Sequence, residues 1–218
     1  MPHHFDQPTR IIAIRHGETA WNVDTRIQGQ LDIGLNDTGR WQAQRVAQAL
    51  AGEPISAIYS SDLFRAWDTA NAVSIATGVV LQPEPGLRER GFGVFEGKTF
   101  QEIETHWPDQ ALLWRKRHPD FAPEGGESLL VMRNRIQGVV NRLASQHAGQ
   151  LIVMVAHGGV MDALYRLATR QDIQAPRTWA LGNAAINRLL WTPQGFTLVG
   201  WADTQHLDDI ALDETTVN

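Results

Sequence analysis

The stretch RIIAIRHGETAWN, residues 10–22, joins an apolar run to a cluster of charged and titratable side chains. Residues 11–14 have the character of a buried strand, and His16 follows two positions later. The stretch LIVMVAHGG, residues 151–159, repeats this design, because an apolar run again leads to a histidine and a glycine. Ligands of open α/β sheets bind at the carboxyl ends of strands. We therefore expect His16 and His157 to lie together at such an edge.

Segments with helical periodicity alternate with the strand-like runs along the whole chain. The expected strands span residues 11–14, 55–59, 151–156 and 185–191, and the expected helices lie within residues 37–52, 61–73 and 127–147. The late stretch RLLWTPQGFTLVGW reads as a hairpin around a Pro-Gln-Gly turn. This alternation predicts an α/β three-layer sandwich, in which helices flank a mostly parallel central sheet.

Length and composition favour a single domain over residues 1–218 that can bury a substantial core, since 43% of the 218 residues are hydrophobic. The stretch 92–127, rich in Gly, Pro and charge, is expected to form a lid-like insertion. Both ends are expected to be loose tails: His3 and His4 lie in the first, and the acidic second begins near Leu207.

Charge and residue types exclude several function classes. A net charge of -5 argues against a general binder of nucleic acid or of anionic membranes, although a local pocket can still be basic. The absence of cysteine excludes disulfides, thiol nucleophiles and thiolate metal sites. The longest apolar run, residues 151–156, is too short to cross a bilayer, and residues 1–10 contain no apolar core of a signal peptide. We therefore expect a cytoplasmic protein.

A third strand end supplies a cation. In AIYSSDLFRAWDTA a strand leads into a helix that we expect Ser61 or Asp62 to cap, which places Arg65 in the first helical turn. A guanidinium beside a helix N-terminus is a natural seat for a phosphate or carboxylate. The alternative is a solvated surface arginine paired with Asp62 or Asp68.

A carboxylate on a glycine-rich turn is the fourth candidate. Glu89 lies between Arg88 and Arg90 and precedes the glycine-rich GFGVFEG. A carboxyl group in this position can act as a general acid and base. The same pattern is also typical of a solvated charge cluster, so this residue carries little weight alone.

Together, these stretches resemble the histidine phosphatase superfamily, which contains the cofactor-dependent phosphoglycerate mutases. The RHGET of residues 15–19 matches the signature of that family. Later blocks occur in family order, over about residues 9–201: Asn22, the QGQLD of residues 28–32, the SSDLxRAxxTA of 60–70, the LRE ending at Glu89, the GES of 126–128 and the HGG beginning at His157. The sequence departs from the commoner family pattern at Gly34, at Asn36 and in the VAHGG motif. None of these departures changes the reactive groups.

The resemblance implies a phosphohistidine formed on His16. It implies that Glu89 protonates the leaving alcohol and then deprotonates the attacking water. Phosphoryl transfer needs mainly positioning and charge stabilisation, so the clamp is expected to require no metal ion and no other cofactor. The residues expected to bind the phosphoryl group are Arg15, Arg65 and His157 as a cationic clamp, with Asn22, Gln28, Gly29 and Gly158 beside them.

Three functions remain open on this basis. The favoured one is a metal-independent phosphomonoester hydrolase acting on a small phosphorylated metabolite. The first alternative is a cofactor-dependent phosphoglycerate mutase, in which a bisphosphorylated donor rephosphorylates the same site. Family mutases carry a longer insertion between the two positions held here by Glu89 and His157, and a small hydroxyl residue at the position of Gln28. The second alternative is a non-catalytic phosphoryl-binding module, which would normally have lost one of the three reactive groups.

Substrate identity is not fixed by these motifs, and sugar phosphates, phosphorylated glycerates and nucleotide-loop phosphates all stay open. Trp21, Gln28, Trp114 and the basic run 115–118 are candidates for the pocket wall, and a solvated helix end is an equal alternative for that run. No nucleic-acid or membrane partner is expected, and self-association into a homodimer stays open.

Overall fold

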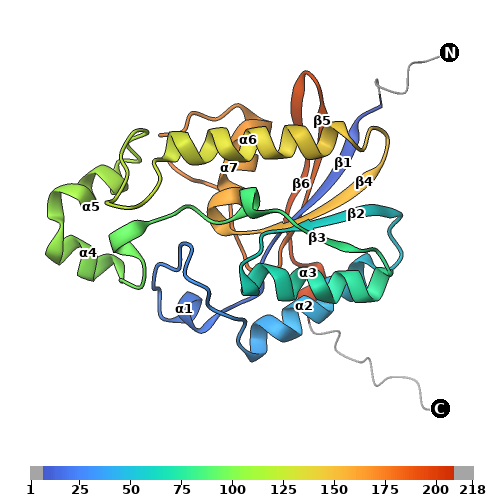
Figure 1. The fold of residues 1–218 in the computed structure, drawn as a ribbon, viewed down its shortest axis with the longest axis horizontal. Helices are drawn as coiled ribbons and strands as arrows, with labels where there is room; N and C mark the ends of the chain where they lie inside the picture. The colour runs from blue at the N-terminus through green and yellow to red at the C-terminus, as the bar shows by residue number, and fades with distance from the viewer. Residues whose placement is uncertain (1–6, 209–218) are drawn as a thin grey trace, which may run out of the picture.

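The computed structural model describes residues 7–208, so His3, His4 and the acidic tail beyond residue 208 lie outside the described part. A six-stranded sheet with the order β3-β2-β4-β1-β5-β6 forms its centre (Figure 1). The first four strands run parallel, whereas β5 is antiparallel to β1 and pairs with β6 as the predicted hairpin. The strands are β1 (Thr9–Arg15), β2 (Ile55–Ser60), β3 (Leu81–Pro83), β4 (Leu151–Ala156), β5 (Ile186–Thr192) and β6 (Gly195–Asp203).

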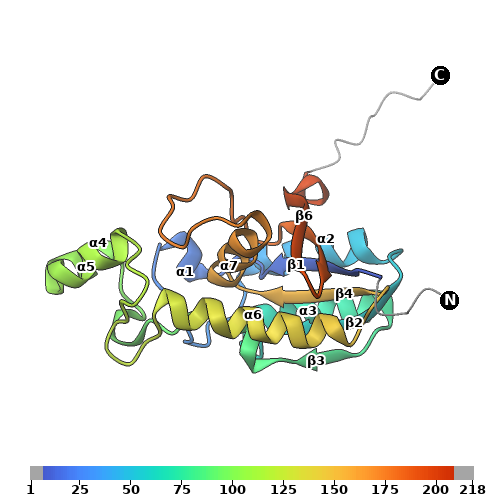
Figure 2. The same cartoon turned by 90° about the horizontal axis from the view of Figure 1, so that it is seen from above.

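Helices cover both faces of this sheet (Figures 1 and 2). Helices α2 and α3 pack on one face, and α6 and α7 pack on the other. The helices are α1 (Ala20–Val23), α2 (Asp37–Leu50), α3 (Phe64–Thr77), α4 (Phe100–His106), α5 (Pro108–Arg115), α6 (Leu129–Ser145) and α7 (Gly158–Thr169), with short 3-10 turns η2 (Pro85–Leu87), η3 (Gly93–Phe95) and η4 (Gln205–Leu207). The predicted three-layer sandwich is confirmed.

The period of two in β1 explains why both faces need cover. Ile12 and Ile14 join the core against α2 and α3, whereas Ile11 and Ala13 join the core against α6 and α7. Every residue of β4, at the centre of the sheet, is buried, as expected for a parallel strand covered on both sides. The apolar runs seen in the sequence are therefore the two halves of one core.

Residues 92–127 form a separate small cluster beyond the sheet. Figure 1 shows α4 and α5 at the end toward which β1 and β4 run. Phe95, Ile103 and Ala111 are fully buried there, and the rings of Phe95 and Trp114 stack with centroids 5.5 Å apart. This insertion is thus built around its own aromatic core and lies at the same edge as the predicted histidines.

Several element boundaries differ from the predicted ones. Helix α2 is capped by Asn36, whose Oδ1 accepts from Gly39 N at 2.8 Å, whereas the sequence pattern predicts Asp37 or Thr38 as the cap. Helix α6 spans Leu129–Ser145, inside the predicted range of 127–147, and begins after Ser128, whose side chain accepts from Val131 N. The predicted C-terminal tail begins too early, since Leu207 lies in η4 and packs against the core of α2 and α3.

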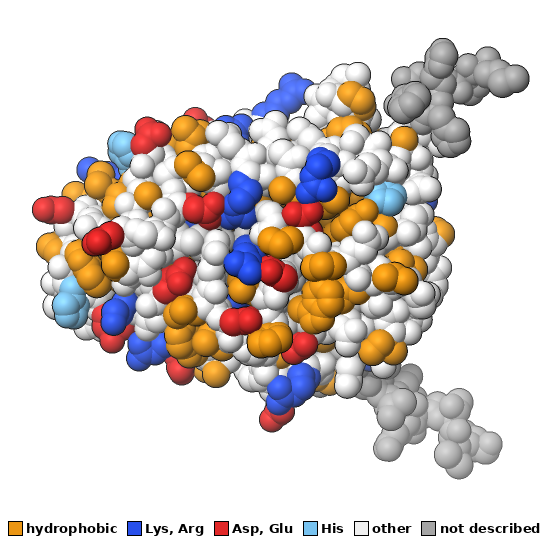
Figure 3. All heavy atoms as spheres, viewed as in Figure 1, with side chains coloured by type: hydrophobic (Ala, Val, Ile, Leu, Met, Phe, Trp, Pro, Cys, Tyr) orange, Lys and Arg blue, Asp and Glu red, His pale blue; other side chains and the backbone are white. Residues whose placement is uncertain are grey.

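The surface carries charges of both signs. Figure 3 shows Lys and Arg side chains interspersed with Asp and Glu on the face seen in Figure 1. None of the helices within residues 7–208 is long and apolar enough to cross a membrane.

Candidate active site

The structure brings His16 and His157 together at the carboxyl ends of two neighbouring strands. Strands β1 and β4 are parallel partners, with Arg15 opposite Ala156, so the residues that follow each strand meet. The ring centroids of the two histidines are 5.2 Å apart, and both side chains are buried. This placement follows from the sheet order, because no other strand separates the two.

The ring of His16 is fixed by its own turn. Its Nδ1 lies 2.7 Å from Gly17 O, and with the proton on Nδ1 the ring donates to this carbonyl and keeps a lone pair on Nε2. Burial, together with the charges of Arg15 and Arg65, holds the pKa of His16 well below 6.5. The imidazole is therefore neutral near pH 7. Gly17 is required here, since a Cβ would come within 2.5 Å of the Gly39 carbonyl oxygen.

The segment that follows β2 holds the side chain of His157. Its Nε2 lies 2.8 Å from Ser61 Oγ, so the hydroxyl that was predicted to cap α3 binds the second histidine instead. Helix α3 begins after Leu63 with no side-chain cap. Burial lowers the pKa of His157 well below 6.5, and the nearby charges of Arg65 and His16 lower it further. An anion bound between these groups would reverse that electrostatic effect.

Arg65 is fully buried, so the alternative of a solvated surface arginine is wrong. Its Nη1 and Nη2 donate to Leu31 O at 2.8 Å and to Gly29 O at 2.7 Å. Gly29 has a φ of +53° and thereby turns its carbonyl toward the guanidinium. Burial lowers the pKa of Arg65 to about 10, which leaves the group charged at neutral pH.

Polar atoms without partners surround the space beside His16. Within residues 7–208, Arg15 Nε, Arg65 Nε, His157 Nδ1 and Gln28 Oε1 are buried and have no hydrogen-bond partner. Buried polar groups in folded proteins are nearly always paired, so a cluster of unpaired nitrogens is typical of a ligand-binding site. Two guanidiniums and an imidazole that can take up a proton indicate an anion, and a phosphoryl group matches them.

Glu89 lies at the N-terminus of α7. Its Oε2 accepts from Gly159 N at 2.9 Å and its Oε1 from Arg90 N at 2.8 Å. A Cβ on Gly159 would lie 2.3 Å from Oε1, so glycine at this position leaves room for the carboxylate. Glu89 and Arg15 line the same cavity of about 440 Å³, which puts the candidate acid and base beside the anion site.

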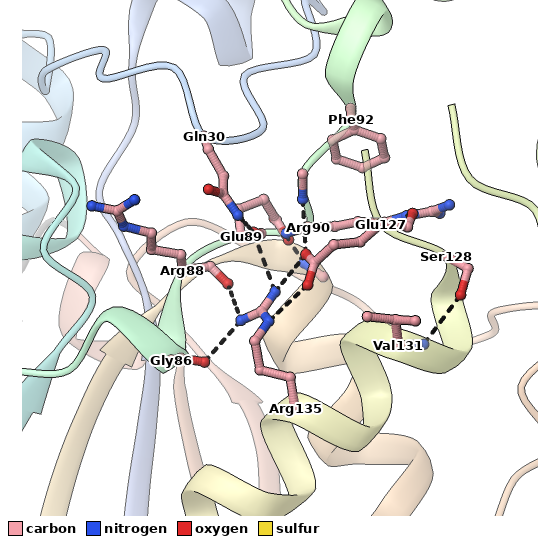
Figure 4. A network of polar contacts seen from close by, with 12 residues as sticks. Gln30, Gly86, Arg88, Glu89, Arg90, Phe92, Glu127, Ser128, Val131 and Arg135 are labelled. Carbon is pink, nitrogen blue, oxygen red and sulfur yellow. Dashed lines mark hydrogen bonds and ion pairs between the residues drawn. The ribbon is translucent and has the colours of Figure 1, made fainter. Parts of the chain in front are cut away.

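A half-buried ion pair between Arg135 and Glu127 holds the segment that carries Glu89 (Figure 4). Arg135 Nη1 donates to Gly86 O at 2.8 Å and to Arg88 O at 3.0 Å, and its other nitrogens pair with Glu127. Glu127 in turn accepts from Gly91 N at 3.0 Å. The sequence did not single out Arg135. The only signal was the GES block of residues 126–128, which contains its partner.

The remaining predicted residues line or brace the site. Asn22 Oδ1 accepts from Thr19 N at 3.0 Å and from Asn183 Nδ2 at 3.3 Å. Asn183 also donates to His16 O at 2.9 Å, a contact that no motif suggested. Gly158 lies against Arg15, since a Cβ there would be 3.5 Å from Arg15 Nε. Backbone support thus comes from the loop before β5 as well as from the motifs.

The candidates for the pocket wall divide into two groups. Trp114 and Arg117 line the cavity, whereas Arg115 forms an exposed ion pair with Glu104 at 2.5 Å. Trp21 packs over Gly97, where a Cβ would lie 3.5 Å from its ring. The basic run 115–118 is therefore both a pocket wall and a solvated helix end, and Arg117 is its contribution to the cavity.

The chain is similar to known proteins in sequence and in structure. The sequence model of the histidine phosphatase superfamily (branch 1) matches residues 11–204. Two relatives from Arabidopsis thaliana are the phosphoglycerate mutase-like protein 4, which is 38% identical over 91% of this chain and 87% of its own length, and a metal-independent phosphoserine phosphatase, which is 35% identical over 93% and 84%. The structure of a mycobacterial glucosyl-3-phosphoglycerate phosphatase with VO3 superposes with a TM-score of 0.78 at 32% identity, covering 89% of this chain and 99% of that chain.

Proposed function

The chain belongs to the histidine phosphatase superfamily, and from this premise we propose that it hydrolyses small phosphomonoesters through a phosphohistidine on His16, without a metal ion. The observation that carries the proposal is the set of unpaired buried nitrogens, from Arg15, Arg65 and His157, beside a neutral imidazole. The relatives named as phosphatases of small phosphorylated substrates support the same class of reaction.

In the first step, His16 Nε2 attacks phosphorus in line with the ester oxygen. The P–N bond forms as the P–O bond to the alcohol breaks, and Glu89 gives a proton to the departing oxygen. Arg15, Arg65 and His157 stabilise the charge that develops on the three equatorial oxygens. Because the hydrogen bond from Nδ1 to Gly17 O orients the ring, the nucleophilic nitrogen needs little reorganisation.

In the second step, water attacks the phosphorus of phosphohistidine from the side that the alcohol has left. Glu89, now a carboxylate, accepts a proton from this water while the P–N bond breaks and the imidazole becomes neutral again. Inorganic phosphate then leaves the clamp. We also propose that residues 1–218 act as a single domain whose insertion 92–127 covers the site as a lid.

The test is the variant His16→Ala, assayed for turnover of p-nitrophenyl phosphate and for acid-labile phosphate on the protein. Both are expected to disappear together, since the cysteine-free chain has no thiol to replace the nucleophile. His147→Ala, which removes a histidine bound to Tyr59 at 2.8 Å, is the matched control and should keep both. Activity should also survive EDTA. Wild-type turnover in His16→Ala would overturn the covalent mechanism.

A further inference from the structure

The cavity beside the clamp is larger and more basic than one phosphoryl group requires. It measures about 440 Å³ and extends from Arg15 and Glu89 along an apolar wall that includes Phe92, Trp114 and Met132. Four arginines and two carboxylates line it: Arg15, Arg90, Arg117 and Arg177, with Glu89 and Asp162. The wall therefore favours a substrate whose remainder is negatively charged.

Two of the outer arginines already have partners. Arg117 Nη2 pairs with Asp162 Oδ2 at 2.8 Å. Arg90 donates to Glu127 O at 2.8 Å and to Phe121 O at 2.9 Å. Among the described residues, Arg177 makes no hydrogen bond and no ion pair. Within this part of the chain it is thus the one arginine of the outer wall that can bind a ligand without giving up a contact to the protein.

The loop that carries Arg177 is anchored on both sides of it. Arg166, itself buried, donates to Ala175 O at 2.9 Å and lies 4.7 Å from the centroid of the Trp179 ring. The same ring stacks on Tyr165 with centroids 4.1 Å apart. Ala175 and Trp179 are each two residues from Arg177. These contacts restrict the freedom of the loop, so a ligand that binds Arg177 loses less entropy than one that must order a free loop.

Arg177 also lies close enough to the clamp to act on the same substrate. Burial is the main cause of the lowered pKa of Arg15. The charge of Glu89 raises this pKa, and the charge of Arg177 lowers it further. Leu181, four residues further along the loop, accepts a hydrogen bond from Arg15 Nη1. The loop therefore connects the phosphoryl clamp directly to the free guanidinium.

We infer that the cavity selects phosphomonoesters that carry a carboxylate, and that Arg177 is the specificity residue that binds this second anionic group. The inference rests on the proposed function, because it describes the remainder of the substrate whose phosphoryl group the clamp holds. A planar guanidinium matches a carboxylate through two parallel hydrogen bonds. Phe92, Trp114 and Met132 pack against the short carbon skeleton between the two charges.

The experiment uses substrate pairs that differ only in the carboxylate: 3-phosphoglycerate against glycerol 3-phosphate, and phosphoserine against phosphoethanolamine. The wild-type protein is expected to prefer the carboxylated member of each pair in kcat/KM. Arg177→Gln should lower kcat/KM for the carboxylated member by about tenfold or more, since hydrogen bonds between charged groups contribute on this scale. The other member should change by less than about twofold.

Arg170→Gln is the matched control, because it removes the same charge from an exposed position at the end of α7 that faces a different cavity. It should leave both substrate pairs unchanged. Equal losses on both members in Arg177→Gln would overturn the inference and assign Arg177 to the phosphoryl group. Equal use of both members by the wild type would overturn it as well.

Turnover of p-nitrophenyl phosphate distinguishes a failure of the inference about Arg177 from a failure of the proposed function. If the wild type turns it over but shows no preference within the pairs, only the inference about Arg177 fails. If the wild type turns over none of these esters, the proposed function fails, and the inference fails with it.

Discussion

Arg135 and Glu127 form a side-on ion pair, in which Nε and Nη2 donate to the two carboxylate oxygens at 2.9 and 2.7 Å. Burial alone would raise the pKa of Glu127, but the hydrogen bonds from Arg135 and from Gly91 N lower it below its ordinary value. Glu127 therefore stays charged at neutral pH, and the pair ties helix α6 to the backbone of residues 86–91. Glu89 lies within that segment, so the pair holds the backbone from which its carboxylate extends.

We predict that Arg135→Ala slows the hydrolysis of alkyl phosphates far more than that of p-nitrophenyl phosphate. A displaced Glu89 donates its proton less well, and an activated aryl leaving group needs little protonation. The expected loss is about tenfold or more on an alkyl ester, within the range that general acid catalysis contributes. Glu89→Gln should show the same dependence on the leaving group.

Arg142→Ala is the control for this prediction, since it breaks a more exposed ion pair with Glu84 on the same helix. Its kinetics should match the wild type. Equal losses on aryl and alkyl esters in Arg135→Ala would mean that the ion pair supports the fold in general and does not position Glu89.

Much of this site follows from sequence patterns because it depends on local rules. Apolar runs that lead to His16 and His157 predict two buried strands, and parallel strands that are neighbours bring their ends together. Arg65 was also placed correctly near the start of a helix. In each case the chemical group lies within a few residues of an element that periodicity identifies.

The unpredicted contacts depend on segments that meet only in the folded chain. Ser61 was predicted as a helix cap because serine is a common cap. Instead, Ser61 follows β2, and its hydroxyl binds His157, which follows β4. Arg135 binds carbonyl groups, which every residue possesses and no pattern distinguishes. Arg177 lies in an irregular loop whose path is set by Arg166 and Trp179. Spacing along the sequence contains none of these relationships.

A second prediction concerns Gly159→Ala, which should lower activity while leaving the fold intact. The new Cβ would lie 2.3 Å from Glu89 Oε1 and 2.9 Å from Met132 Cε, so the carboxylate has to move. Alanine is otherwise favourable within a helix, by about 0.5–1 kcal/mol relative to glycine. We therefore expect a loss of kcat of about tenfold or more, measured on an alkyl phosphate, with a thermal unfolding midpoint near the wild-type value.

Gly138→Ala provides the matched control, because Gly138 lies inside helix α6 and a Cβ there meets nothing within 4 Å. It should raise stability by about 0.5–1 kcal/mol without changing kcat. Unchanged activity in Gly159→Ala would indicate that the position of Glu89 tolerates the displacement.

The two buried histidines predict a loss of stability in mild acid. Burial holds the pKa values of His16 and His157 well below 6.5, so the unfolded chain binds protons that the folded chain does not. The free energy of unfolding should keep its full value above about pH 6.5. Below that pH it should fall by at most about 1.4 kcal/mol per pH unit for each histidine. Urea unfolding at pH 7.5, 6.5 and 5.5 measures this slope.

The double variant His16→Asn/His157→Asn should show a shallower decrease over the same range, because the two groups that take up protons on unfolding are gone. A slope equal to that of the wild type would assign the acid sensitivity to other groups. His206 is one such group, since burial also lowers its pKa.

The last prediction separates hydrolysis from phosphoryl exchange, and it favours hydrolysis. A mutase has to retain a bisphosphorylated intermediate while that intermediate turns around, so it needs cations for a second phosphoryl group outside the clamp. Along the described outer wall, Arg117 is paired with Asp162, Arg90 is bonded to two backbone carbonyls, and only Arg177 has no partner in the protein. One guanidinium suits a carboxylate, whereas a carboxylate and a second phosphoryl dianion together require more positive charge.

We therefore expect the protein, given 3-phosphoglycerate and a bisphosphoglycerate primer, to release free phosphate faster than it forms 2-phosphoglycerate. Phosphate is followed by a colorimetric assay and the isomer by coupled enolase, in the same reaction mixture. Arg177→Gln should lower the rate of phosphate release from 3-phosphoglycerate and should not raise the isomer yield. Rapid isomerisation with little phosphate release would reverse the choice, because phosphohistidine would then be protected from water until its acceptor alcohol had reoriented.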